Sequence, residues 1–186
     1  MTRTINIKKI VSRKALTAIS VAIAIASVVV MTTAWQIPQA IATSLEEIKV
    51  SREISAPADQ VWNIVSDVDD ETKYWPTYKT IKNINKTDNI IEREVIVKAG
   101  PKDAKTHQFV TVNPEQMLIQ TNITEGPVTG SRVLSLSRSS DINATKIDVL
   151  WNVDMSGIPA LARGFAKDNF MKTTEEALNR IAQTVE

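Results

Sequence analysis

Few side chains in this protein are suited to acid–base or nucleophilic chemistry. His107 is the single histidine, and there is no cysteine, which excludes thiol catalysis, disulfides and thiolate metal sites. On its predicted strand, His107 shares a face with Phe109 and Thr111, and that face points either to an interior or to water. A lone strand histidine is more often structural or solvated than functional, so His107 is a weak acid–base candidate. We predict no metal site and no cofactor.

Two arginines occupy unusual positions on predicted strands. Arg52 and Arg93 each lie on the otherwise apolar side, in the patterns Val50-Arg52-Ile54 and Ile91-Arg93-Val95-Val97. A charge that is turned into an interior must be paired. A ligand carboxylate or phosphate is one partner that suits a guanidinium. The interpretation we favour is a neighbouring acidic side chain, or a strand end that lets the arginine reach solvent.

Acidic residues gather after the first predicted helix, at Asp67, Asp69, Asp70 and Glu71. Their spacing lacks the mid-loop glycine and the terminal glutamate of an EF-hand. We therefore interpret this cluster as a solvated helix end. Glu92 and Glu94 lie on the opposite side of their strand from Arg93, as expected for the wet face of a sheet.

Strands and helices that position these residues are predicted from Leu45 onward, where alternating apolar and polar residues begin. In chain order they are a strand over 45–54, a helix over 57–65, a short helix or turn ended by Pro76, strands over roughly 78–85, 90–99, 105–112, 116–125, 131–139 and 144–155, and a helix from Ile158 to about Val185. The apolar stripe of the last helix is expected to include Leu161, Phe165 or Ala166, Phe170, Ala177, Leu178, Ile181 and Val185. Core or cavity-lining positions are expected for Trp62, Trp75, Trp151 and Phe165.

The first 42 residues carry five basic residues and no acidic one. The uncharged run over residues 15–35 is long enough to cross roughly 30 Å of hydrocarbon as a helix. Because the basic residues all precede this run, the positive-inside rule places the following domain outside the cytoplasm. Ala40-Ile41-Ala42 offers a cleavage site. We expect either a single-pass membrane protein or a protein secreted after cleavage near Ala42.

The composition indicates that the rest of the chain, residues 43–186, forms one globular domain. Hydrophobic residues make up 43% of the chain and charged residues 23%, as in ordinary soluble domains. Beyond the first 42 residues, 17 of the 22 basic residues remain against all 21 acidic ones. A mildly acidic domain is poorly suited to nucleic acid. Glycosylation sequons begin at Asn85, Asn122 and Asn143, and they have meaning only if the domain is exported.

A family resemblance rests on the stretch from Val50 to Trp62, on Asp67 and Trp75-Pro76, and on Gly157 with the long helix that follows it. In these features the chain resembles the START/Bet v 1-like (SRPBCC) superfamily. The similarity is greatest to its polyketide cyclase/dehydrase and lipid transport branch. It covers about residues 46–185 and implies an α+β helix-grip fold. In that fold a seven-stranded antiparallel sheet wraps around the C-terminal helix and leaves an apolar cavity. The glycine-rich loop of the plant members is replaced here by Lys86-Thr87-Asp88-Asn89, so phosphate-loop arguments do not transfer.

The resemblance implies a binder of a hydrophobic small molecule or lipid, and this is the function we place first. Two alternatives are a cyclase, aromatase or dehydratase that uses His107, Arg52, Arg93 or Tyr78 as its acid or base, and a non-catalytic interaction module with a packed interior. The membrane partner is expected to meet residues 15–35. The predicted ligand-binding residues are Arg52, Trp75, Tyr78, Arg93, His107, Trp151 and Phe165.

Overall fold

The computed structural model describes residues 45–139, 141 and 143–185, which belong to one compact unit, Ser44–Glu186. The predicted membrane or signal helix, residues 15–35, and the cleavage site near Ala42 lie outside the described residues. Across the part of the chain that is described, none of the helices combines the length and the apolar character that a membrane crossing needs.

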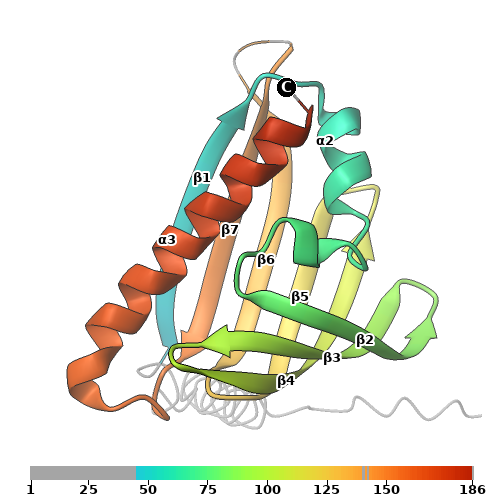
Figure 1. Ribbon diagram of the computed structural model, residues 1–186. Helices are drawn as coiled ribbons and strands as arrows, with labels where there is room; N and C mark the ends of the chain where they lie inside the picture. Colours follow the sequence, from blue (N-terminus) through green and yellow to red (C-terminus); the bar gives the residue numbers. More distant parts are fainter. Residues whose placement is uncertain (1–44, 140, 142, 186) are drawn as a thin grey trace, which may run out of the picture. The chain divides into compact units, whose positions relative to one another are not determined.

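Seven antiparallel strands form one sheet in the order β1-β7-β6-β5-β4-β3-β2 (Figure 1). The predicted α+β fold with a long C-terminal helix is confirmed, because one short helix and one 3-10 turn follow the first strand and a single helix closes the domain. The elements are β1 (Leu45–Ile54), α2 (Ala58–Val65), η2 (Glu71–Lys73), β2 (Tyr78–Thr87), β3 (Ile90–Ala99), β4 (Lys102–Asn113), β5 (Leu118–Glu125), β6 (Thr129–Arg138), β7 (Thr145–Asp154) and α3 (Ala160–Val185).

The largest difference from the predicted bounds is at β4, which begins at Lys102 rather than near residue 105. The hairpin between β3 and β4 is tight, and Ala99 pairs with Lys102 across Gly100 and Pro101. Gly100 has a φ of +71°, a backbone conformation that glycine adopts without a steric penalty. The ladder therefore extends to the turn itself, although Asp103 and Lys105 are polar.

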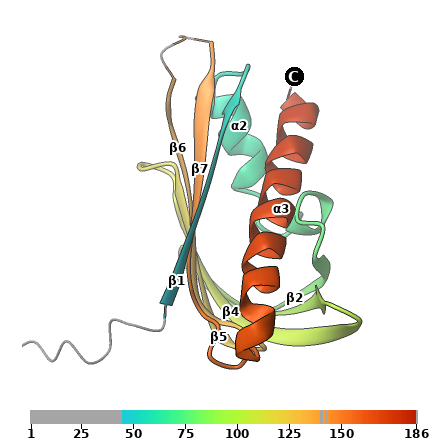
Figure 2. The same ribbon diagram turned by 90° about the vertical axis from the view of Figure 1, so that its left-hand side faces the viewer.

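Helix α3 lies across the inner side of the bent sheet, as the two views in Figures 1 and 2 show. The inner face follows strict strand alternation, which β7 illustrates with buried Ile147, Val149, Trp151 and Val153. The side chains that α3 buries all come from its second half: Thr174, Ala177, Leu178, Ile181 and Ala182.

One position of the predicted apolar stripe on α3 is wrong, Leu161, and of the two alternatives Phe165 and Ala166 it is Ala166 that faces the core. Leu161 is 102% exposed and Phe165 is 80% exposed, so Phe165 is neither a core nor a cavity-lining residue. Ala166 and Phe170 pack against the core instead. The reason is helical phase: successive residues are about 100° apart around a helix, so burial of Ala166 turns Phe165 outward. Sequence periodicity allowed either of these two residues, and packing against the sheet selects the smaller one.

Candidate functional site

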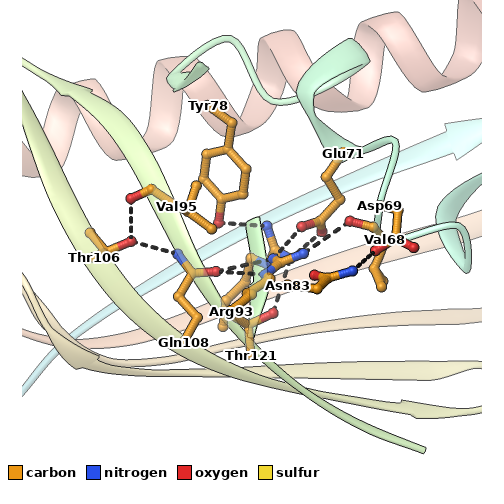
Figure 3. A network of polar contacts seen from close by, with 11 residues as sticks. Val68, Asp69, Glu71, Tyr78, Asn83, Arg93, Val95, Thr106, Gln108 and Thr121 are labelled. Atoms are coloured by element: carbon orange, nitrogen blue, oxygen red, sulfur yellow. Dashed lines mark hydrogen bonds and ion pairs between the residues drawn. The ribbon is translucent and has the colours of Figure 1, made fainter. Parts of the chain in front are cut away.

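Three charged side chains meet inside the domain: Glu71 of η2, Arg93 of β3 and Arg132 of β6. Neither arginine has exposed surface, and Glu71 is 4% exposed. Arg93 Nη2 donates to Glu71 Oε2 at 2.5 Å, and Arg132 Nη2 donates to Glu71 Oε1. One carboxylate thus bridges two guanidinium groups. We call these three residues the buried triad; Figure 3 shows its Glu71–Arg93 side.

Strand alternation and sheet register bring the two arginines to the inner face. Arg93 lies between buried Ile91 and Val95 on β3, and Arg132 shares its side of β6 with Leu134. The third member arrives from the loop before β2. There the backbone carbonyl of Glu71 accepts hydrogen bonds from the N–H groups three and four residues later, at Tyr74 (3.1 Å) and Trp75 (2.9 Å), and this tight turn directs the Glu71 side chain inward.

Arg93 has protein partners for each of its three nitrogens. Nη1 donates to the backbone carbonyl of Val68 at 2.9 Å, while Nε and Nη2 donate to Gln108 Oε1 at 3.2 and 3.0 Å. Gln108 is the cross-strand partner of Arg93. Its amide donates in turn to Thr106 Oγ1 at 3.0 Å (Figure 3). This chain of contacts fixes the Arg93 guanidinium in one orientation.

Arg132 is held less completely than Arg93. Nη2 also donates to Thr121 Oγ1 at 3.0 Å, and Nη1 makes a long contact of 3.4 Å to the Tyr78 hydroxyl. Its Nε has no hydrogen-bond partner among the described residues. The guanidinium carbon lies 4.2 Å from the centre of the Trp75 ring and 5.6 Å from that of Trp151, so ring faces supply part of the stabilisation that this charge lost with water.

Burial and the neighbouring charges shift the pKa values of Glu71 and Arg132 in opposite directions. Burial by itself raises the pKa of Glu71, but the positive charges of Arg132 and Arg93 and their hydrogen bonds outweigh it, and the pKa lies below its ordinary 4.5. Burial lowers the pKa of Arg132, and the Glu71 carboxylate more than offsets this, so that pKa is raised. Glu71 is therefore ionised at neutral pH. Because arginine side chains keep their charge in proteins, the triad carries a net charge of one positive unit.

An aromatic row leads from the triad toward α3. Trp75 and Trp151 meet edge to face with ring centres 5.8 Å apart, and Trp151 meets Phe170 of α3 in the same way at 5.1 Å. Trp151 Nε1 also donates to Thr174 Oγ1 at 3.0 Å, which ties β7 to the middle of the helix. The row forms an apolar wall that connects Arg132 with the half-buried part of α3.

Four of the predicted ligand-binding residues come together at this site: Arg93, Trp75, Tyr78 and Trp151. His107 lies on the outer face of the sheet, where its ring nitrogens are 3.0 Å from Glu92 Oε1 and 3.0 Å from Thr124 Oγ1. His107 is therefore turned to the water side of its strand, one of the two orientations that the sequence allowed.

Arg52 and Phe165 lie apart from the triad. Arg52 is on the inner side of β1, as its parity predicted, and one of its Nη groups donates to Asn179 Oδ1 of α3. Phe165 points outward from α3. Arg93 is paired with a neighbouring acid, which was the interpretation we favoured.

Sequence reasoning missed four polar residues of the site: Glu71, Gln108, Thr121 and Arg132. The interpretation of Glu71 as part of a solvated helix end is wrong, because the 3-10 turn inserts it between the arginines. Its neighbours in the acidic cluster offered no way to single it out. Arg132 did carry a signal, since it shares the apolar side of its strand with Leu134 and Leu136, the same pattern that singled out Arg93.

The surface has two hollows worth noting. One of about 180 Å³ lies beside Asn85, Asp88 and Phe109. The other, about 310 Å³, is lined by Asp67, Val68 and Asp69 of the loop before η2 and by Asp88 and Asn89 of the β2–β3 turn. Within the described residues, histidine and acidic side chains do not gather into a group of three that is suited to a metal ion. The chemistry of the site is thus that of a cationic, aromatic-lined interior.

Solved structures that are similar to this chain share its fold. The protein TTHA0849 from Thermus thermophilus has a TM-score of 0.66 at 14% identity, over 75% of this chain and 97% of that one. The Zhui aromatase/cyclase from Streptomyces sp. R1128 has a TM-score of 0.65 at 13% identity, over 76% and 93%. A START superfamily protein from Mycobacterium smegmatis has a TM-score of 0.62 at 16% identity, over 75% and 96%.

Comparison with curated proteins found no match. The family model described as polyketide cyclase / dehydrase and lipid transport matches residues 46–186, which include every strand from the second residue of β1 onward and all three helical elements. That span contains the buried triad and the aromatic row. This chain therefore belongs to the polyketide cyclase/dehydrase and lipid transport family.

Proposed function

We propose that the domain binds a hydrophobic small molecule or lipid between the inner face of the sheet and the first half of α3. One observation carries this location. Every residue that α3 buries lies at or beyond Thr174, whereas Ala166 and Phe170 are only partly buried where they meet the core. The first half of the helix thus buries less of its own surface than the second half, and a less tightly packed apolar contact is where a ligand enters at least cost.

A neutral fluorescent probe tests this proposal. The full chain is titrated with 1-N-phenylnaphthylamine, whose emission rises in an apolar site. We expect one probe per chain, and we expect Phe170→Ala to weaken binding about tenfold because it removes one ring of the wall.

Phe165→Ala is the matched control, since it removes the same side chain from the outward side of the same helix. It should leave the affinity unchanged. A lack of binding, or equal loss in the two variants, would contradict the proposed location.

An enzyme of the cyclase or dehydratase type is the second candidate function. The observation that favours it is the Tyr78 hydroxyl, 3.4 Å from Arg132 Nη1, where a phenol beside a cation is placed to exchange a proton with a bound carbonyl compound. If the domain is such an enzyme, Tyr78→Phe abolishes turnover and leaves probe binding intact. If it is a binder only, no turnover accompanies binding in either protein.

We also propose that the N-terminal segment takes the domain to the outer side of a membrane. The uncharged run over residues 15–35, with basic residues only before it, supports this. Mass measurement of the protein recovered from cells provides the test. A full-length mass in the membrane fraction indicates an anchor, and a mass that begins at Thr43 indicates secretion. Recovery of the full-length chain in the soluble fraction would contradict the proposal.

A further inference from the structure

The charge balance of the buried triad is incomplete. Among the residues that the structure describes, Glu71, Arg93 and Arg132 are the only buried residues with a charge. Two guanidinium groups share one carboxylate, and Arg132 Nε lacks a hydrogen-bond partner there. A buried positive charge without a matching anion is costly, and such charges persist where a partner completes them. An anion must therefore lie between the two guanidinium groups, and Glu71 supplies it in the described domain.

Glu71 is also the member of the triad that is easiest to move. Both arginines are fixed within a seven-stranded sheet, whereas Glu71 belongs to the three-residue turn η2. Val68, just before this turn, lines the hollow of about 310 Å³ and its carbonyl accepts a hydrogen bond from Arg93. The hollow thus borders the chain that leads into η2. Val68 itself is 3% exposed and packs in the core, so an outward shift of this segment must move Val68 as well.

We propose that the ligand is an amphipathic carboxylate, and that its carboxylate replaces Glu71 between Arg93 and Arg132. This inference rests on the proposed binding function and specifies the polar end of the ligand. The two ligand oxygens take the positions of Glu71 Oε1 and Oε2, each facing one guanidinium. The apolar chain then follows the row from Trp75 past Trp151 to Phe170. In the ligand-free domain Glu71 acts as an internal substitute for this headgroup.

A carboxylate fits better than other polar ends. Neutral hydroxyl or carbonyl groups would leave both guanidinium groups without an anion once Glu71 has moved. The existing geometry accepts one planar group with two oxygens, and Thr121 Oγ1, 3.0 Å from Arg132 Nη2, limits the space for a third. Arg93 and Arg132 approach from different strands, so each contributes one hydrogen bond to a different oxygen.

The experiment titrates the full chain, in the form recovered from cells, with octanoate, octanol and octyl phosphate. We expect the wild-type protein to bind octanoate about tenfold or more tightly than octanol, because charge-assisted hydrogen bonds favour the anion. Glu71→Gln removes the internal competitor and should strengthen octanoate binding about tenfold again, with octanol changed much less. Glu92→Gln, a carboxylate on the outer face, is the control and should change neither affinity.

Each result bears on a different part of the inference. Equal binding of octanoate and octanol by the wild type overturns the carboxylate assignment and leaves the proposed function standing. Preference for octyl phosphate overturns it in favour of another anion. Weaker octanoate binding by Glu71→Gln overturns the replacement of Glu71. If that variant does not fold, Glu71→Asp, which shortens the competitor, should show the same change in a smaller degree. Failure of all three probes to bind contradicts the proposed function itself.

Discussion

Replacing Glu71 with glutamine is expected to lower the free energy of unfolding by about 3–5 kcal/mol, the usual effect of removing one partner from a buried ion pair. The amide keeps the size of the carboxyl but not its charge. Arg93 and Arg132, neither of which has exposed surface, are then buried without an anion. Urea denaturation followed by tryptophan fluorescence measures the change, because Trp75 and Trp151 both adjoin the triad.

Glu92→Gln provides the comparison for this measurement. It removes a carboxylate from the outer face, where Glu92 pairs with His107 at 3.0 Å and its side chain is 31% exposed. Solvent screens that pair, so the expected loss is at most about 1 kcal/mol. Equal losses in the two variants would mean that the buried triad contributes nothing specific to its interior position.

The pH dependence of protein stability should report the ion pairs of Glu71 as well. The pKa of Glu71 is lowered in the folded state relative to its ordinary 4.5, so folding favours the ionised form. The stability that this group contributes is complete above the unfolded pKa and is lost as the pH falls through the folded value. Wild-type protein should therefore lose stability on acidification below about pH 4.5 more steeply than Glu71→Gln, which has no such proton to bind.

Arg132→Met is the second substitution with a large expected effect, a loss of about 3–5 kcal/mol. Two causes combine. Glu71 keeps only Arg93 as its cationic partner, and the guanidinium 4.2 Å from the Trp75 ring is replaced by a neutral side chain. Methionine fills much of the arginine volume, so the loss reports charge and stacking more than a cavity. Thermal and urea unfolding of the variant measure it.

Removing the whole triad should behave differently from removing one member. The combined substitutions Glu71→Leu, Arg93→Met and Arg132→Met leave no buried charge among the described residues. Such replacements are often neutral or stabilising by about 1–4 kcal/mol. We expect the combined variant to be more stable than Arg132→Met alone and to bind octanoate no better than octanol. A combined variant that is less stable than the single one would show that the triad is retained for stability rather than for binding.

Much of the fold follows from local sequence pattern. Alternation along the predicted strands identified the inward side of β1, β3 and β7, and it correctly turned Arg93 inward and Glu92 outward. The residues from Val50 to Trp62 and the long final helix were enough to indicate the family, which the match over residues 46–186 confirms. These features depend on neighbours two to four positions apart, and such periodicities are visible in the chain itself.

The site depended on contacts that no local pattern contains. Glu71 and Arg132 are 61 positions apart in the sequence, and they meet only because η2 folds over the middle of the sheet. The same acidic cluster that reads as a solvated helix end contains one carboxylate that tertiary packing buries. Likewise, periodicity left Phe165 and Ala166 as equal choices, and the fit of α3 against the inner face selected Ala166.

What the sequence by itself determined, then, is the face of each strand, the residues available for an interior and the family. It identified Arg93, Trp75, Tyr78 and Trp151 as candidates. Only the tertiary structure joined Glu71, Arg93 and Arg132 into one buried triad with an uncompensated positive charge. The physical reason is that side-chain direction is set by local backbone geometry, whereas pairing and burial are set by which distant segments pack together.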